Sequence, residues 1–463
     1  MKRIALCCAL ALCLALTACA PALPPQPTLE ELLAEVNAAH QAVQRPEVDA
    51  EQYLREGPDQ ETVARFTEGE LTAFNSDAEL TAAQAAEDVE YLFEAFRTLY
   101  GPYEYFGGDE TFGAHKAELL ARLAEKDSWT AAEVQDLLLE GLRFFQDGHF
   151  NINGGKPNPP KVPFFFREAA FYKTEEGGYI REDGRRVASV DGCDDLDGLF
   201  KRSISQEGEL VCYPVLLKEW TMTAQPQPCD EQLTVRYADG SAQALTAEPF
   251  QRYSEEIDAD NVTEYYKNGE IPVFALNMCD DAACDAADAA AIMVARAPVG
   301  MVDLRTNPGG SDLICNLWLR RYTHTERNNM YRNQYVMNVF SGPFSGADGW
   351  VENDGRVLIV LTGKRAASAA ETFVDMAHNV ENVLFIGENT SGAQVTSAAY
   401  HIQLPHSKCV VTMGHGLFVV PQDWDYYEEL RGYEPDIWVP AAEAEELAVK
   451  WMKNLGAVGA PQE

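Results

Sequence analysis

In two segments of the sequence, an apolar run is followed by residues that could do chemistry. The first run is followed by two glycines, and the second by a serine. Residues 302–310 read VDLRTNPGG, and residues 361–371 read LTGKRAASAAE. Glycines after a buried strand let backbone N–H groups face a ligand, and the start of a helix adds positive potential, so the first segment suits an oxyanion. In the second segment, Ser368 falls near the first helical turn, where a nucleophilic hydroxyl can be exposed beside the Ala369 N–H.

Each segment also has a purely structural interpretation. The first segment can be a tight turn between a strand and a helix, with no site. Ser368 can be an N-cap serine, which is a common role for this residue type. Neither pattern establishes chemistry alone, so the other motifs of the chain have to be weighed with them.

Five short motifs occur in an order that resembles the tail-specific (C-terminal processing) protease family, which includes tricorn-core and retinoid-binding-protein-like members. Each motif is weak alone, and the five together are specific. The resemblance covers roughly residues 80–150 and 270–440. It implies an α/β core of the ClpP-like or crotonase-like type, and serine peptidase activity with Ser368 as nucleophile. The motifs are Asp147-Gly-His-Phe150, Asp303-Leu-Arg-x-Asn-Pro-Gly-Gly310, Ser368-Ala-Ala-Glu371, Gly387-Glu-x-Thr-x-Gly392 and Gly432-x-x-Pro-Asp436.

One departure from the family pattern concerns the catalytic base. In the processing proteases a lysine lies shortly after the last glycine of the Gly-Glu-x-Thr-x-Gly motif. Here Gly392 is followed by Ala393 and Gln394, and an alanine cannot take a proton. The tricorn-like branch uses a histidine that an acidic residue orients near the Gly-x-x-Pro-Asp motif. The resemblance therefore assigns His149 as base and Glu429 as the orienting carboxylate.

This assignment has a consistent chemistry. A neutral imidazole with a pKa of about 6.5 can accept the serine proton near pH 7. A carboxylate on its other nitrogen fixes the tautomer and stabilises the imidazolium. The oxyanion hole would use the N–H of Gly309 or Gly310 together with that of Ala369, each lowering the barrier by roughly 3 kcal/mol.

Several alternatives remain open at the sequence level. His149 can be a structural residue after a glycine that stops a helix, and Lys364 is a candidate replacement base four residues before Ser368. Other acids close to Glu429 are candidate orienters, namely Asp425, Glu428 and Glu434. Three histidines near the C-terminus compete for the role of base, namely His401, His406 and His415.

The elements that must position these residues form a series along the chain. Capping boxes at Thr28, Thr81 and Thr130 precede apolar residues at helical spacing, short β-type runs follow from about residue 160, and strands alternate with helices from about residue 271. Such alternation predicts a largely parallel sheet. The expected parts are a signal peptide (1–18), a tether and N-terminal helix (19–78), a helical subdomain carrying His149 (79–155), a β-rich module (156–265) and the α/β protease core (266–463).

The β-rich module has two interpretations. Residues 186–192 faintly resemble a strand of PDZ domains, which bind the C-terminal tails of substrates in many processing proteases. No clear carboxylate-binding glycine-rich loop precedes that strand. The module is therefore either a diverged PDZ-like domain or an unrelated β insertion that shapes the cleft.

The N-terminus carries an export signal. A basic start (Lys2, Arg3) and an apolar run over residues 4–16 precede Leu-Thr-Ala-Cys19, which resembles the bacterial lipoprotein signal with Cys19 as the lipidated residue. The alternative is an ordinary secretory signal that is cleaved near Ala20. The proline-rich residues 20–27 indicate an extended tether. We expect an extracytoplasmic protein that is lipid-anchored to the cell membrane.

Composition and charge exclude some classes of function and of site. The chain has 463 residues, 36 basic against 73 acidic ones, and a net charge of −37. Such a chain repels phosphate backbones, so nucleic-acid binding is excluded as a function class. Seven cysteines follow Cys19, an odd number that cannot pair completely, and no Cys/His spacing is typical of a zinc site. No metal or cofactor is expected.

The sequence thus predicts a membrane-anchored serine peptidase that cleaves peptide bonds through an acyl-enzyme, with a Ser-His-Glu site and a peptide or protein substrate. One alternative is a catalytically degenerate peptide-binding homologue, which the missing lysine at position 393 suggests. Another is a serine hydrolase that acts on a non-peptide ester or amide, since the motifs do not identify the acyl group.

Overall fold

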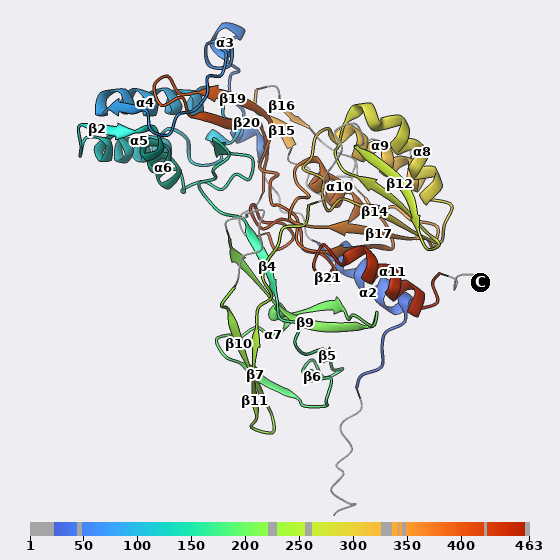
Figure 1. Cartoon of the computed structure of the whole chain (residues 1–463). Helices are drawn as coiled ribbons and strands as arrows, with labels where there is room; N and C mark the ends of the chain where they lie inside the picture. The colour runs from blue at the N-terminus through green and yellow to red at the C-terminus, as the bar shows by residue number, and fades with distance from the viewer. Residues whose placement is uncertain are drawn as a thin grey trace, which may run out of the picture.

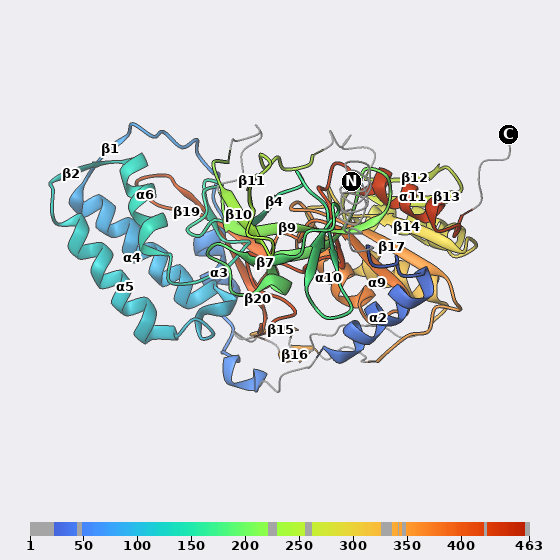
Figure 2. The ribbon, with the colours of Figure 1, turned by 90° about the horizontal axis from the view of Figure 1, so that it is seen from below.

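The computed structural model describes residues 23–43, 49–220, 229–254, 262–325, 336–340, 342–344, 349–420 and 424–458. The expected signal peptide and Cys19 lie outside these residues. No helix in the described part is long and apolar enough to cross a bilayer. A helical subdomain and an α/β unit lie at opposite ends of the molecule (Figure 2).

The α/β unit is built on a six-stranded sheet with the order β12-β13-β14-β17-β18-β21. All neighbours from β13 to β21 are parallel, and β12 runs antiparallel at the edge. Parallel strands that are covered on both faces read as continuous apolar runs, as VLIVLT of β17 does. The strands are β12 (Thr263–Asn268), β13 (Ile271–Leu276), β14 (Val299–Asp303), β17 (Val357–Thr362), β18 (Val383–Gly387) and β21 (Ile437–Trp438).

Helices cover both faces of this sheet (Figure 1). On one face, α8 (Cys284–Val294), α9 (Asp312–Thr323) and α10 (Ala369–Ala377) share a core with Val302 and Val360, and the short 3₁₀ helix η3 (Asp281–Ala283) precedes α8. On the other face, α2 (Leu29–Ala42) and α11 (Ala444–Asn454) pack on Met301 and Ile359. Successive side chains of a strand point to opposite faces of the sheet, so each strand contributes residues to the apolar core on both faces. This arrangement confirms the predicted α/β core.

The helical subdomain gathers three helices around an aromatic core that includes Phe96, Phe145 and Phe150. Its elements are β1 (Glu79–Thr81), α4 (Ala82–Leu99), the 3₁₀ helix η2 (Gly101–Tyr103), α5 (Gly108–Leu123), β2 (Ser128–Thr130) and α6 (Ala131–Gly141). The capping boxes expected at Thr81 and Thr130 begin α4 and α6. Upstream lie η1 (Ala50–Tyr53) and α3 (Gln60–Thr67).

A hairpin from the C-terminal part of the chain completes this subdomain. Strands β19 (Thr396–Gln403) and β20 (Val410–Phe418) place Ile402 and Val411 in the same aromatic core (Figure 1). Strand β3 (Asn151–Ile152) pairs with β20, with Ile152 opposite Val411. Strands β15 (Val336–Asn338) and β16 (Gly342–Phe344) extend the hairpin sheet. Residues 396–418, expected in the α/β core, thus pack mainly with the helices.

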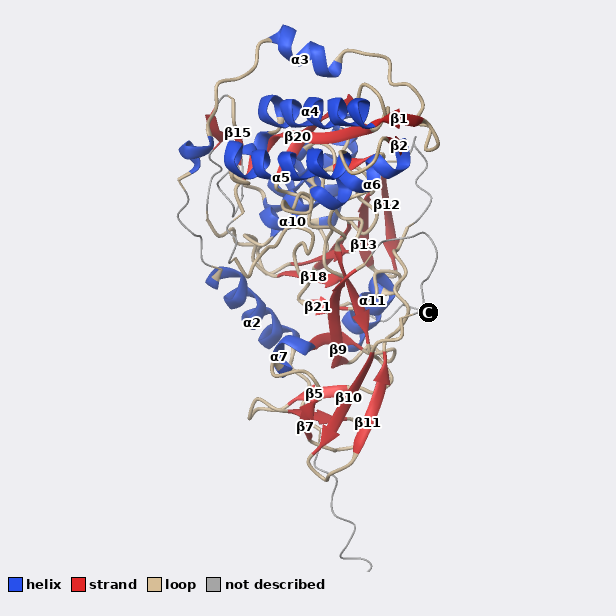
Figure 3. Ribbon diagram, turned by 90° about the vertical axis from the view of Figure 1, so that its left-hand side faces the viewer, coloured by secondary structure: helices blue, strands red, loops and turns tan. Residues whose placement is uncertain are grey.

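The β-rich module projects from the molecule on the side of α2 and α11 (Figure 3). It holds one three-stranded sheet, β11-β10-β7, and a second sheet in which β9 pairs with β4, β5 and β8. Its sheet order gives no confirmation of a PDZ-like domain. Its elements are β4 (Lys161–Phe165), β5 (Phe171–Lys173), β6 (Tyr179–Arg181), β7 (Val187–Val190), α7 (Leu196–Leu199), β8 (Phe200–Ile204), β9 (Leu210–Glu219), β10 (Gln232–Tyr237) and β11 (Ala242–Thr246).

Candidate active site

Ser368 lies at the sharp turn between β17 and α10, as the N-cap residue of the helix. Its backbone angles are φ 55° and ψ −120°, and its side chain is partly exposed. A positive φ at a residue other than glycine is strained, and such strain persists only where the surrounding structure enforces it. The turn therefore presents the Ser368 hydroxyl at the carboxyl end of the sheet, where the sequence placed a nucleophile.

Asn307 ties the loop after β14 to the Ser368 turn. Its backbone carbonyl accepts a hydrogen bond from the Ala367 N–H at 3.1 Å, and its side-chain carbonyl accepts one from the Gly309 N–H at 2.8 Å. A Cβ atom on Gly309, which has φ +107°, would lie 2.6 Å from the Ser368 Cβ. The glycine is therefore required for the close approach of the two loops.

Two backbone N–H groups beside Ser368 are available for an oxyanion. The amides of Gly310 and Ala369 have no hydrogen-bond partner among the residues that the structure describes. The Gly309 amide, also predicted as a donor, is bonded to Asn307 instead. Of the three predicted donors, the Gly310 and Ala369 amides are thus the two without a partner in the described part of the chain.

Glu371 holds a second loop against the Ser368 turn. This fully buried carboxylate accepts hydrogen bonds from the Ser368 N–H at 3.2 Å, the Thr390 hydroxyl at 2.6 Å, the Gly392 N–H at 2.8 Å and the Ala393 N–H at 2.7 Å. Burial raises the pKa of Glu371. One Glu371 oxygen bonds both Ser368 and Ala393, so position 393, where the family has its lysine, lies next to the predicted nucleophile.

The turn that carries His149 packs directly on this loop. A Cβ atom on Gly148 would lie 2.3 Å from the Gly392 carbonyl oxygen and 2.7 Å from the Ala393 Cα. Asp147 fixes the turn by accepting hydrogen bonds from the His149 N–H at 2.8 Å, the Tyr100 hydroxyl at 2.9 Å and the Thr396 hydroxyl at 2.9 Å. The fold thus brings Gly148 and His149 to the loop that Glu371 binds beside Ser368.

The His149 ring is partly exposed and has an unpaired nitrogen. Its Nδ1 is buried without a hydrogen-bond partner in the described part of the chain, and no hydrogen bond joins the ring to the Ser368 hydroxyl there. Burial lowers the pKa of His149 below its usual 6.5, and the Asp147 charge opposes this shift. Catalytic hydrogen bonds are commonly long in unliganded enzymes and tighten on substrate binding.

Glu429 contacts the His149 turn through the backbone. It is buried and accepts hydrogen bonds from the Gly148 N–H at 2.7 Å, the Gln394 N–H at 3.0 Å, the Val395 N–H at 3.1 Å and the Tyr427 hydroxyl at 2.6 Å. Burial and the nearby Asp147 charge raise the pKa of Glu429 to about 8. Among the described contacts, none joins Glu429 to the imidazole itself.

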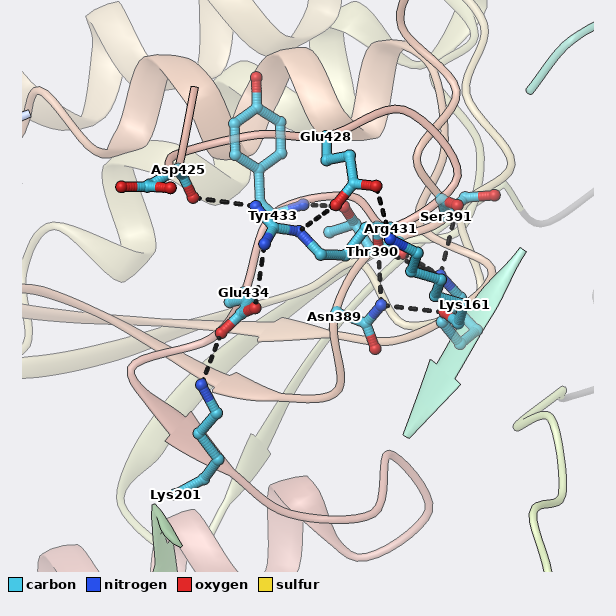
Figure 4. Close-up of polar contacts among 11 residues, drawn as sticks. Lys161, Lys201, Asn389, Thr390, Ser391, Asp425, Glu428, Arg431, Tyr433 and Glu434 are labelled. Carbon is cyan, nitrogen blue, oxygen red and sulfur yellow. Dashed lines mark hydrogen bonds and ion pairs between the residues drawn. The ribbon is translucent and has the colours of Figure 1, made fainter. Parts of the chain in front are cut away.

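The competing acids belong to another network. Figure 4 shows the Arg431 side chain between Glu428 and Glu434. Glu428 pairs with Lys161 at 2.5 Å, and Glu434 pairs with Lys201 at 3.1 Å. Both lysines lie on the β-rich module. The Asp425 carbonyl accepts a hydrogen bond from Arg431. This network joins the module to the loop that carries Glu429.

The competing histidines are engaged on the hairpin. His401 contacts the Thr412 hydroxyl at 3.0 Å, His406 pairs with Glu87 at 2.6 Å, and the His415 ring packs against Tyr400. Their neighbours are thus residues of the hairpin and of α4, whereas His149 is the histidine whose turn contacts the Ser368 loops.

Two lysines lie close to the site, and sequence reasoning missed one of them. Lys364 is buried, and its ammonium donates to the carbonyls of Thr390, Ser391 and Arg431; burial lowers the pKa of Lys364 to about 7. The ammonium of Lys156 donates to the Gly148 carbonyl. No spacing pattern marks Lys156, because a backbone carbonyl carries no sequence signal.

Two surface hollows flank the site. One of about 460 Å³ is lined by the oxyanion-loop residues 308–311 and by residues 278–281. Another of about 360 Å³ is lined by Tyr105, Phe144, Val395 and Glu429 together with six further residues. No group of three or more potential metal ligands occurs in the described part of the chain. The seven cysteines after Cys19 are all unpaired.

Comparisons with known proteins give one family match and several similar structures. Residues 290–439, about a third of the chain, match the model of peptidase family S41. No curated protein matches. Similar solved structures include mature CPAF (11% identity, TM-score 0.40, 82% of this chain and 99% of that one) and the photosystem II D1 C-terminal processing protease (14%, 0.36, 77% and 93%).

A third similar structure is a putative peptidase from Parabacteroides merdae, with 14% identity, a TM-score of 0.39 and coverage of 82% of this chain and 100% of that one. The matched family segment contains Ser368, both glycines of the oxyanion loop and Glu429. It holds the parallel strands β14, β17, β18 and β21, whereas β13 lies before it. Over this segment the chain is similar to peptidase family S41, the tail-specific serine proteases.

Proposed function

We propose that Ser368 is the nucleophile and His149 the general base of this peptidase. The Ser368 oxygen attacks the peptide carbonyl while His149 takes its proton, and the amides of Gly310 and Ala369 stabilise the oxyanion. The imidazolium then protonates the leaving amine, and water hydrolyses the acyl-enzyme by the reverse sequence. The observation that carries the proposal is Glu371, which binds the Ser368 turn and the loop under Gly148 with one carboxylate.

In this proposal Glu429 orients the base indirectly. Its carboxylate accepts a hydrogen bond from Gly148, directly before His149, and from two amides of the adjoining loop. A carboxylate that binds both segments fixes the backbone from which the imidazole projects. Glu429 is therefore a positioning residue rather than a group on the imidazole nitrogen.

Fluorophosphonate labelling tests the proposal. Wild-type protein should react, Ser368→Ala should not react at all, and His149→Ala should react at least about 100-fold more slowly, because base catalysis of this kind contributes 10²–10⁴-fold. Ser189→Ala on β7 and His401→Ala on β19 are matched controls on exposed positions and should react normally.

The outcomes separate the alternatives. A folded wild-type protein that does not react favours the degenerate peptide-binding homologue. A protein that reacts but cleaves no member of a peptide library, while it hydrolyses small esters, favours a non-peptide hydrolase. Labelling that survives in Ser368→Ala refutes the assignment of the nucleophile.

We also propose that the peptidase is lipid-anchored through Cys19 on the outer face of the cell membrane. The motif Leu-Thr-Ala-Cys19 after an apolar run and the proline-rich tether support this proposal. Cys19→Ala should release the protein from the membrane fraction or leave its signal uncleaved. A Cys19→Ala protein that has lost its signal peptide and still stays in the membrane fraction contradicts the anchor.

A further inference from the structure

Lys156 brings an ammonium group to the turn that carries His149. The residue as a whole is exposed, but its Nζ donates a hydrogen bond to the Gly148 carbonyl in a partly buried contact. Lys156 lies between β3 and β4, in the connection from the helical subdomain to the β-rich module. Its ammonium therefore points back toward the site from an exposed residue of this connection.

The bond from Lys156 completes the fixation of one peptide unit. The carbonyl of the Gly148–His149 peptide accepts from Lys156, and the N–H of the same peptide donates to Asp147 at 2.8 Å. The Gly148 N–H, on the preceding peptide, donates to Glu429 at 2.7 Å. The peptide from which the imidazole projects is thus held at both polar ends by charged side chains, in addition to the packing of Gly148 on Ala393.

Opposite charges surround this turn. The groups that act electrostatically on the Lys156 ammonium are Asp147, Glu429 and Glu371, and the ammonium in turn acts on His149 and on Lys364. For the imidazole itself, burial has the largest influence on the pKa and favours the neutral form; the negative charge of Asp147 favours the protonated form, and the positive charge of Lys156 adds to the effect of burial. Only the neutral imidazole can accept the serine proton.

We propose that Lys156 is a positioning residue of the Ser368–His149 site, which fixes the peptide before His149 and places a positive charge beside the imidazole. The proposal rests on the proposed function. It assigns to the connecting segment a role that the family motifs do not include. It also explains why an ammonium turns inward at a position where solvent is available.

Three variants separate the two parts of this role. Lys156→Met removes both the donor and the charge, Lys156→Gln keeps a donor without the charge, and Lys156→Arg keeps both. Lys161→Met is a matched control, because Lys161 pairs with Glu428 on the outer network. Asp147→Asn removes the negative charge that acts against Lys156, so it should shift the pKa of His149 in the opposite direction to Lys156→Met.

The primary measurement is the titration of His149 by NMR with histidine-selective isotope labelling, assigned with His149→Gln. In Lys156→Met and Lys156→Gln the pKa of His149 should rise by roughly half a unit or more, because a nearby positive charge is lost. It should stay unchanged in Lys156→Arg and Lys161→Met and fall in Asp147→Asn. The acid limb of the labelling rate should move by the same amounts.

An unchanged His149 pKa in folded Lys156→Met or Lys156→Gln overturns the charge role. A labelling rate in Lys156→Met that stays within twofold of wild type at pH 8, where the imidazole is neutral in every variant, overturns the positioning role. The titration does not require catalysis, so it is interpretable even if Ser368→Ala refutes the proposed function. If Lys156→Met does not fold, Lys156→Gln and Lys156→Arg still provide the comparison.

Discussion

The two sides of the candidate site are assembled by different means. Ser368 and Gly309 follow neighbouring parallel strands of one sheet, and their loops meet because the carboxyl ends of such strands share an edge. His149 comes from the helical subdomain and reaches the site through the contact of Gly148 with Ala393. The nucleophile side therefore depends on the fold of one unit, whereas the base side depends on how two units meet.

Three buried carboxylates reflect this difference. The core of the helical subdomain is mostly aromatic and aliphatic. The contact between the two units instead buries Asp147, Glu371 and Glu429, whose partners are mainly backbone amides of loops. Irregular loops leave N–H groups that no regular element satisfies, and a buried carboxylate can satisfy several of them at once.

The largest effect should come from Glu371→Gln, which affects both sides. The substitution replaces an acceptor of four hydrogen bonds by an amide whose NH₂ faces backbone N–H groups. Unsatisfied buried donors cost about 1–3 kcal/mol each, so the free energy of unfolding should fall by about 2–4 kcal/mol, with loss of labelling. Urea denaturation measures this. Glu94→Gln, in an exposed pair with Arg65, should change stability by less than about 1 kcal/mol.

Gly309→Ala should damage the nucleophile side alone. Its Cβ would lie 2.6 Å from the Ser368 Cβ and 2.9 Å from the Ala367 carbonyl oxygen, so the Ser368 turn must shift. A displacement of about 1 Å at a catalytic group can cost roughly 100-fold in rate, and we expect that loss in the labelling rate. Gly355→Ala, with φ +72° and open space around it, is the matched control. Equal rates in the two variants would contradict the close approach.

The pH dependence of labelling examines the base side. Burial lowers the pKa of His149 below 6.5, so the neutral base already predominates at a lower pH than for a free histidine. The rate should rise with pH below 6.5 and stay level above it. If the labelling rate of His149→Ala still rises with pH near 7, the base would instead be Lys364, because burial lowers the pKa of Lys364 to about 7. A rise only above pH 9 would indicate an unperturbed lysine.

The smallest effect should come from a helix cap far from the contact. Thr130→Ala removes the capping box at the start of α6 and should cost about 1 kcal/mol of stability. The labelling rate and its pH profile should not change, because the cap does not touch the turn at His149. A shifted profile would mean that the position of the base depends on the stability of the helical subdomain as a whole.

The two loops beside Ser368 could be predicted from the sequence to a large extent. Apolar runs located β14 and β17, and glycines after the first run and a serine after the second indicated loops at one sheet edge. The availability of the Gly310 amide and the engagement of the Gly309 amide could not be predicted, because the choice depends on where the Asn307 side chain points.

The base side was accessible only through the family resemblance. The packing of Gly148 on Ala393 joins residues far apart in the chain, and no periodicity reports such a contact. The partners of Glu371, Glu429 and Lys156 are mostly backbone groups, which every residue type carries. The sequence also placed residues 396–418 in the α/β core, whereas β19 and β20 form a long hairpin that packs with the helices.

That hairpin has a consequence for the order in which the protein can fold during synthesis. Helices α4, α5 and α6 leave the ribosome early, but the apolar surface around Phe96 and Phe150 is closed by Ile402 and Val411, which emerge much later. Such an intermediate exposes aromatic side chains and is prone to aggregation. A nascent chain that stops before residue 396 would therefore need a chaperone, and an expression fragment that ends there should be insoluble.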